Sequence, residues 1–127
     1  DWGLIDLIKK AYLKGALLCG VSAGAICWFQ KGVTDSWGNE LKLLDCIGLI
    51  KDNGCPHYNG EADRRPTVKS FLKKGKIDKC ICIDDGAAIH YVDGEVKSGI
   101  DFDGGSVYNA YLLGNDFIED KLPAIKL

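Results

Sequence analysis

The sequence has no run of basic residues and only two histidines among its 127 residues. Its 16 lysines and arginines are outnumbered by 18 acidic residues, which gives a formal net charge of -2 at pH 7. A nucleic-acid-binding surface needs clustered Lys and Arg to neutralise phosphates. We therefore expect no nucleic acid among the partners of this protein.

Long hydrophobic runs are also lacking, because no apolar stretch approaches the roughly 20 residues of a transmembrane helix. The opening residues Asp-Trp-Gly do not have the pattern of a secretory signal peptide. Hydrophobic residues still make up 46% and charged residues 27%, as in ordinary globular proteins. We expect a single domain over residues 1–127 that has no membrane partner and is cytoplasmic.

No two cysteines show the C-x-x-C spacing that is typical of a zinc site. The six cysteines are Cys19, Cys27, Cys46, Cys55, Cys80 and Cys82. An even number also suits a secreted disulfide scaffold, but three of them lie in apolar runs, where free cysteine behaves as a small buried hydrophobe. We therefore expect reduced cysteines, as in cytoplasmic proteins, and no metal site.

The stretch Gly20-Val21-Ser22-Ala23-Gly24 has the G-x-S-x-G spacing of a nucleophile elbow. In such an elbow a strand breaks at a tight turn and restarts as a helix, so that the serine hydroxyl stands clear of the sheet. Only small neighbours permit that turn. An ordinary surface serine in a glycine-rich turn is the alternative interpretation, because short motifs also match by chance.

The order of predicted elements is typical of an α/β fold with a mainly parallel sheet. We predict helices over 4–13, 23–30 and 66–74, strands over 16–19, 79–83 and 106–113, a strand within 41–50, a loop over 31–39, and a hairpin of 87–92 with 95–97 around Asp93-Gly94. A nucleophile strand is normally central, with other strands laid down before it. We therefore expect that N-terminal strands of the domain are missing from this chain.

An elbow serine is a weak nucleophile unless a base takes its proton, and histidine has the suitable pKa. His57 lies in an irregular segment after a strand, where functional residues are usually found. His90 lies within a predicted strand, where a half-exposed position is the simplest account. We favour His57 as the base.

The base needs a carboxylate that fixes its tautomer, and three aspartates are candidates. Asp85 follows a strand directly before Gly86, on the edge of the sheet where the elbow is expected. Asp84 should point the other way, since side chains alternate along a strand. Asp35 lies in the loop after the elbow helix and would give the Ser-Asp-His order of α/β-hydrolases.

Three blocks, around Ser22, His57 and Asp85, together resemble the dipeptidase E family of serine peptidases, which is related to the cyanophycinases. The resemblance covers about residues 4–110 and implies a flavodoxin-like, three-layer α/β/α fold. It also implies a triad in which Ser22 is the nucleophile, His57 the base and Asp85 the acid. Asp35 matches a second acidic position of the family and is our second choice.

The resemblance further implies an oxyanion hole and a substrate-binding arginine. The backbone N–H of Ala23 matches one oxyanion donor, and the second belongs to a glycine-rich turn upstream of the first helix seen here. Arg64 or Arg65 matches, with a displacement of one residue, the arginine that binds the aspartyl side chain of Asp-X dipeptides. Both arginines are alternatively ordinary solvated charges at the start of a helix.

We predict a serine-type peptidase that hydrolyses small peptides, with Asp-X dipeptides as candidate substrates and with no metal or organic cofactor. A non-catalytic fragment or pseudo-enzyme of the same fold is one alternative. A cyanophycinase-like hydrolase of β-aspartyl peptides is another. Besides the small peptide, the expected partner is a second copy of the chain in a homodimer, or the missing N-terminal segment.

Overall fold

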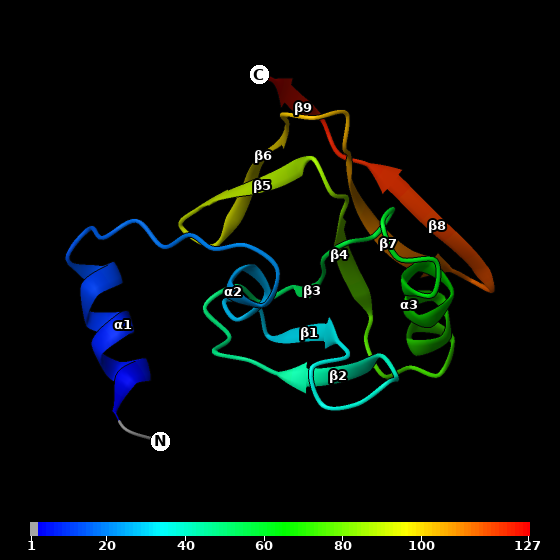
Figure 1. The fold of residues 1–127 in the computed structure, drawn as a ribbon, viewed down its shortest axis with the longest axis horizontal. Helices are drawn as coiled ribbons and strands as arrows, with labels where there is room; N and C mark the ends of the chain where they lie inside the picture. The colour runs from blue at the N-terminus through cyan, green and yellow to red at the C-terminus, as the bar shows by residue number, and fades with distance from the viewer. Residues whose placement is uncertain (1–2) are drawn as a thin grey trace.

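The computed structural model describes residues 3–127 and shows three helices and a set of strands (Figure 1). Their order is α1 (Leu4–Leu13), α2 (Ala23–Ile26), β1 (Lys31–Thr34), β2 (Lys42–Asp45), β3 (Asn53–Cys55), α3 (Arg64–Lys73), β4 (Lys79–Ile83), β5 (Ala87–Val92), β6 (Glu95–Asp101), β7 (Val107–Leu113), β8 (Asp116–Lys121) and β9 (Ala124–Lys126). The protein is therefore of the α/β class, as expected from the sequence. Within the part of the chain described here, no helix has the length and apolar character needed to cross a membrane.

The main sheet has the strand order β2-β1-β3-β4-β7-β8 and is mixed, whereas we expected it to be mainly parallel. Strands β1, β3 and β4 are parallel to one another, and the outer pairs are antiparallel. The length of the connection between two strands explains why some pairs are parallel and others antiparallel. Helix α3 supplies the long crossover between β3 and β4, while β7 and β8 are joined by a tight turn that forces them to be antiparallel.

A second, smaller sheet has the order β5-β6-β9 and lies beside the main sheet (Figure 1). Its hairpin turns at Asp93 and Gly94, whose φ angles of 52° and 82° are those of a type I′ turn. The predicted hairpin is thus confirmed. The tail, for which the sequence predicted no element, supplies β8 to the main sheet and β9 to the smaller one.

Side chains of β4 alternate between two hydrophobic clusters on opposite faces of the main sheet. Cys80 and Cys82 face the cluster under α3, together with Val68 and Leu72 of that helix. The other face carries Ile81 and Ile83 with Ile26, Phe29 and Val107. Helix α3 therefore covers one face, whereas α2 and the small sheet cover the other.

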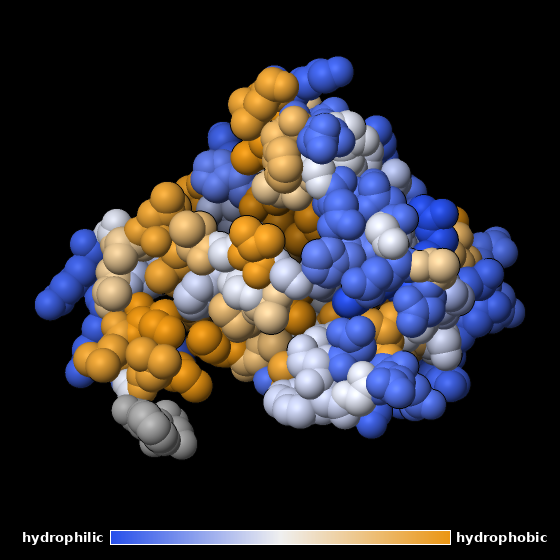
Figure 2. Space-filling model, viewed as in Figure 1, coloured by the Kyte–Doolittle hydropathy of each residue, from blue (hydrophilic) through white to orange (hydrophobic). Residues whose placement is uncertain are grey.

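Helix α1 forms as predicted, and none of its residues is buried. Leu4, Leu7 and Leu13 are 60%, 62% and 83% exposed. Figure 1 shows the helix standing apart from the sheets, and Figure 2 shows apolar surface in the same place. Its leucine side chains are thus largely exposed to solvent.

The strand predicted over 16–19 does not form, and this prediction is wrong. A strand is stabilised by hydrogen bonds to a neighbour, and no described strand pairs with this segment. Leu17 is accordingly 85% exposed, and Cys19, expected to be buried, is exposed too.

Two further boundaries differ from the prediction. The helix expected over 23–30 ends at Ile26, and the loop expected over 31–39 begins with β1. The end of α2 lies close to Gly32 in β1, where a Cβ would be 2.6 Å from Cδ1 of Ile26. The glycine lets α2 approach the strand closely.

All six cysteines are free, and Cys55, Cys80 and Cys82 are buried as small hydrophobic residues. Burial raises the pKa of the Cys55 thiol, so this side chain stays protonated and unreactive. These cysteines contribute to packing and not to a disulfide scaffold.

Phe29 provides a test of this packing, because it links the segment after α2 to the small sheet. It is 2% exposed, and its ring meets that of Tyr91 edge-on with centroids 5.9 Å apart. We expect Phe29→Ala to lower the free energy of unfolding by about 3–5 kcal/mol in urea denaturation. Trp37→Ala, at a 71% exposed position, should change it by less than about 0.5 kcal/mol. Similar losses in both variants would contradict the assignment of the core.

Candidate active site

Ser22 occupies a strained turn directly before α2. Its φ of 53° and ψ of -119° are unusual for a residue with a side chain and cost about 1–3 kcal/mol. The turn closes tightly, since a Cβ on Gly20 would lie only 2.1 Å from the carbonyl oxygen of Gly24. Gly20 is therefore required for this conformation, which presents the Ser22 side chain at the start of the helix.

His57 lies two residues beyond the end of β3 and faces Ser22. Its Nε2 is 2.8 Å from Oγ of Ser22. The backbone around it is a compact turn: the N–H groups of Gly60 and Glu61 both donate to the carbonyl of His57, whose φ is 54°. The N–H of Tyr58 donates to the carbonyl of Ile83 and so attaches this turn to the end of β4.

Asp85 lies two residues beyond the end of β4 and contacts the other nitrogen of the histidine ring. Its Oδ1 is 2.6 Å from Nδ1 of His57, and its backbone N–H donates to Oδ1 of Asn59 at 2.8 Å. Two glycines make room for it. A Cβ on Gly60 would lie 2.2 Å from Oδ2 of Asp85, and one on Gly105 would lie 2.4 Å from its carbonyl oxygen.

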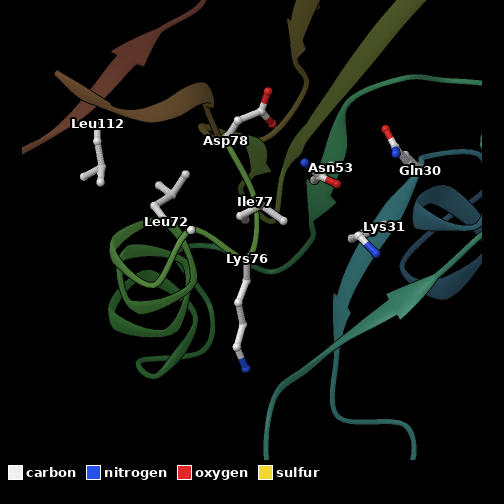
Figure 3. A pocket seen from close by; sticks show the side chains of 9 residues that line it. Gln30, Lys31, Asn53, Leu72, Lys76, Ile77, Asp78 and Leu112 are labelled. Atoms are coloured by element: carbon white, nitrogen blue, oxygen red, sulfur yellow. The ribbon is translucent and has the colours of Figure 1, made fainter. Parts of the chain in front are cut away.

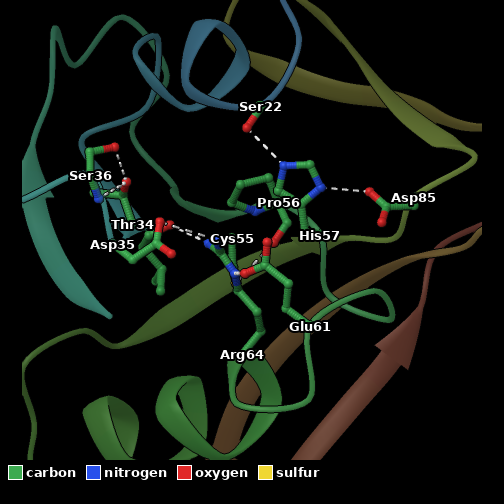
Figure 4. A network of polar contacts seen from close by, with 11 residues as sticks. Ser22, Thr34, Asp35, Ser36, Cys55, Pro56, His57, Glu61, Arg64 and Asp85 are labelled. Carbon is green, nitrogen blue, oxygen red and sulfur yellow. Dashed lines mark hydrogen bonds and ion pairs between the residues drawn. The ribbon is translucent and has the colours of Figure 1, made fainter. Parts of the chain in front are cut away.

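Parallel pairing brings these residues together at one edge of the sheet. Strands β3 and β4 are neighbours, so the segments after their carboxyl ends lie side by side, and this edge is where α/β proteins usually bind ligands. Figure 4 shows Ser22, His57 and Asp85 in one line of hydrogen bonds.

The other two candidate acids do not contact His57. Oδ2 of Asp84 accepts a hydrogen bond from the N–H of Ser106 at 3.0 Å, and burial raises the pKa of this carboxyl group. Asp35 follows β1 at the same edge of the sheet, but its carboxylate lies 3.9 Å from the guanidinium of Arg64 (Figure 4). Of the three aspartates, only Asp85 contacts the ring of His57.

Arg64 is a buried part of the fold at the start of α3. It is 3% exposed, donates from Nε to Glu61 at 2.6 Å and from Nη1 to the carbonyl of Val33 at 2.8 Å. Burial acts to lower the pKa of Arg64, but the hydrogen bond that it donates to Glu61 and the nearby charges outweigh this effect and raise the pKa. This guanidinium is charged, and its Nε and Nη1 atoms already have partners.

Arg65 lies on the outer side of the same helix start. Its Nε contacts Glu119 at 2.9 Å, and its guanidinium lies over the ring of Tyr58 at 5.1 Å from the centroid. The structure therefore directs the two arginines to different partners, and it brings neither of them to Ser22.

A cavity of about 420 Å³ lies beside Ser22 and is lined by the segment 17–22, the turn at His57, the end of β4 and the small sheet. Ser22, His57 and Asp85 all line it, whereas Asp35, Arg64 and Arg65 do not. His90, the other histidine, lines it from β5. The volume falls in the range typical of small-molecule sites.

A second cavity, of about 560 Å³, lies at the opposite edge of the sheet (Figure 3). Lys31 and Asn53 line it from the first residues of β1 and β3, and Lys76 and Asp78 from the turn before β4. Its Lys31 is already paired with Asp45. Among residues 3–127 there is also no cluster of His, Cys, Asp and Glu that would hold a metal ion.

Sequence reasoning assigned no role to Asn59, Gly60 or Gly105, although each helps to position Asp85. The dipeptide Asn59-Gly60 is typical of tight turns, and it follows two residues after the histidine. Gly105 gave no signal, because it approaches Asp85 only after the chain has folded.

The N–H of Ala23 is the first donor after the turn. The following N–H groups, of Gly24, Ala25 and Ile26, donate to the carbonyls of Val21 and Ser22. Ala23 makes no such bond in the described structure, so its N–H is the one at the start of α2 without a backbone partner among the described residues.

Comparison with known proteins gives two matches. The sequence model described as peptidase family S51 matches residues 1–99. The chain is also 36% identical over 124 residues to a protein of Bacillus subtilis (strain 168) described as uncharacterized peptidase YgaJ. That alignment covers 97% of this chain and 54% of the relative, so the chain spans about half the length of the protein it matches. These matches confirm the resemblance that the three sequence blocks indicated.

The two glycines around Ser22 provide a matched test of the turn. Gly20→Ala meets the backbone of Gly24 and should lower the free energy of unfolding by about 1–3 kcal/mol. Gly24 lies in α2, and a Cβ there would meet nothing within 4 Å, so Gly24→Ala should raise stability by about 0.5–1 kcal/mol. Urea denaturation of both variants measures the difference. Equal effects would contradict the tight closure of the turn.

Proposed function

Because the chain belongs to peptidase family S51, we propose that it carries the serine-type catalytic site of a peptidase that hydrolyses small peptides. One observation carries the proposal: Ser22, His57 and Asp85 form a continuous chain of hydrogen bonds of 2.8 Å and 2.6 Å. This is the geometry of a nucleophile, a base and an orienting acid, which is recognised by roles and not by fold.

In the proposed mechanism, Oγ of Ser22 attacks the scissile carbonyl while Nε2 of His57 takes the hydroxyl proton. Asp85 accepts the hydrogen bond from Nδ1–H, which fixes the tautomer and stabilises the imidazolium. His57 then gives the proton to the leaving amine. A water molecule, activated by the same base, releases the acyl group from Ser22. These steps require neither a metal nor an organic cofactor.

In this scheme the backbone N–H of Ala23 stabilises the negative charge of the transition state. This N–H is placed directly after the nucleophile and donates to the oxyanion that forms during attack. The family resemblance implies a second donor from a glycine-rich turn, to which no described residue corresponds. One such donor contributes about 3 kcal/mol to the transition state.

We propose further that the complete domain is a flavodoxin-like, three-layer α/β/α structure in which other polypeptide covers α1 and pairs with segment 16–19. A preceding segment of a longer chain, or a second copy of this one, would serve. The exposure of Leu13 and Leu17, at 83% and 85%, supports this proposal. The six free cysteines support a cytoplasmic location.

The same exposure favours one alternative, a non-catalytic fragment of the fold. A serine turn whose preceding segment has no strand partner is less rigidly held than one inside a sheet. The alternative predicts a folded chain in which Ser22 has no unusual reactivity.

Labelling with a fluorophosphonate separates the two proposals, because only an activated serine reacts. We expect the chain to be labelled at Ser22, and we expect no labelling of Ser22→Ala or His57→Ala. Ser36→Ala serves as the matched control, since Ser36 bonds only with Thr34 and lies away from the site. A folded chain without labelling would overturn the catalytic proposal and support the fragment.

Asparagine substitutions identify the acid. Asp85→Asn should reduce kcat of peptide hydrolysis on the order of 10⁴-fold, because the histidine is then held in the wrong tautomer. Asp35→Asn and Asp84→Asn change the same group outside the hydrogen-bond chain and should have effects of only a few-fold. A large loss in Asp35→Asn with a small one in Asp85→Asn would reverse the assignment.

A further inference from the structure

We propose that Tyr58 is a positioning residue of the base His57, and that its hydrogen bond to Glu119 holds the turn in which the base lies. The inference rests on the proposed function and adds to it the residues that keep the base in place. Glu119 belongs to β8, at one edge of the main sheet, so the inference links this strand to the site (Figure 1).

The backbone of His57 has a conformation that needs support from its surroundings. Its φ of 54° lies in the left-handed region, which is unfavourable for a residue with a side chain and persists only where the surrounding structure fixes it. On one side of His57 the chain is fixed by Pro56, whose ring locks φ, and by Cys55 of β3, which is fully buried. On the other side lies Tyr58. The conformation of His57 therefore depends on what holds Tyr58.

Tyr58 is held both by its backbone and by its side chain. Its N–H donates to the carbonyl of Ile83 at 3.1 Å. Its side chain is buried in the cluster under α3, where its ring lies 6.0 Å from that of Tyr108. Its hydroxyl donates to Oε1 of Glu119. Burial raises the pKa of Tyr58, so the hydroxyl stays protonated and remains a donor.

Glu119 is fixed as the acceptor by the sheet and by Arg65. It lies opposite Ala110 in the β7–β8 ladder, and Ala110 is buried in the same cluster as Tyr58. Opposed residues of a ladder point to the same face of a sheet, so Glu119 lies on the face that α3 covers. Arg65, at the start of α3, contacts the same Oε1 from Nε at 2.9 Å. One carboxylate oxygen therefore joins Tyr58 to both β8 and α3.

These contacts act on the geometry of the base, because Tyr58 and His57 are neighbours in the chain. The two ring nitrogens of His57 meet Asp85 and Ser22 at the same time, at 2.6 Å and 2.8 Å. A displacement of about 1 Å at a reacting group reduces the rate on the order of a hundredfold. Neither Tyr58 nor Glu119 lines the cavity beside Ser22, so substitutions here affect the base without changing the space for the peptide.

The rate of fluorophosphonate labelling at Ser22 tests the inference. Tyr58→Phe removes the hydroxyl and keeps the buried ring, and it should lower the labelling rate at least about fivefold, as should Glu119→Ala. Glu119→Gln keeps an oxygen acceptor for Tyr58 and should restore most of the rate. An unchanged rate in Tyr58→Phe, or a Glu119→Gln variant as slow as Glu119→Ala, would overturn the inference.

Two control variants separate positioning from a loss of stability. Tyr111→Phe removes a hydrogen bond of the same kind, to Asp120 at 2.7 Å, between the same two strands. Val68→Ala removes packing from the cluster that contains Tyr58. Both should be labelled within about twofold of the unmodified rate, because a modestly destabilised chain is still almost entirely folded. Equal losses in Val68→Ala and Tyr58→Phe would overturn the inference, since both would then report on stability.

Nuclear magnetic resonance of the His57 ring distinguishes failure of this inference from failure of the proposed function, because it requires no reactive serine. Tyr58→Phe should lower the fraction of the ring that is protonated on Nδ1, and Tyr111→Phe should not. If the ring signals are the same in Tyr58→Phe, the inference fails whether or not the chain is labelled. An unmodified chain that is not labelled overturns the catalytic proposal, whereas a changed ring in Tyr58→Phe still supports the role of Tyr58 in placing His57.

Discussion

The contact between His57 and Asp85 is the interaction on which the site depends. It joins the segment after β3 to the segment after β4, and it determines which nitrogen of the ring faces Ser22. The contact requires two features of the turn after β3: the φ of 54° at His57, and glycine at position 60, where a Cβ would meet the carboxylate of Asp85. A side chain at position 60 would displace the carboxylate. The backbone at position 57 and the residue type at position 60 are therefore restricted so that Nδ1 of His57 lies 2.6 Å from Oδ1 of Asp85.

The parallel centre of the sheet and its antiparallel surroundings have different roles. Strands β1, β3 and β4 present their carboxyl ends at one edge, and the turns after β3 and β4 carry the candidate catalytic groups. The antiparallel strands extend the sheet, while the small sheet covers the face that also holds α2. That cover makes one wall of the cavity beside Ser22. A mixed sheet is thus compatible with a site at the end of parallel strands.

Local sequence signals predicted much of this arrangement. The positions of Gly and Pro predicted α3 and the β5–β6 hairpin. The small residues around Ser22 predicted the tight turn. The strand at 16–19 failed because strand formation needs a partner, which a local apolar run cannot reveal. Lys31–Thr34 was missed for the opposite reason: its polar, glycine-bearing sequence becomes a strand only between β2 and β3. The arginines could not be placed either, since the burial of Arg64 depends on the carbonyl of Val33 in β1.

Helix α1 has exposed leucine side chains, and the chain matches about half the length of its relative. Segment 16–19, which leads into Ser22, pairs with no described strand, whereas His57 and Asp85 follow the paired strands β3 and β4. Of the two contacts in the hydrogen-bond chain, the one between Ser22 and His57 therefore depends on a segment that no described strand supports.

Nuclear magnetic resonance of the two histidine rings tests the central claim most directly, because nitrogen shifts and couplings distinguish the tautomers. The structure predicts that neutral His57 carries its proton on Nδ1 and donates it to Asp85, while Nε2 accepts from Ser22. Asp85→Asn should abolish this signature, and Asp35→Asn should preserve it. A His57 ring protonated on Nε2, or one unaffected by Asp85→Asn, would contradict the hydrogen-bond chain from which the proposed function follows.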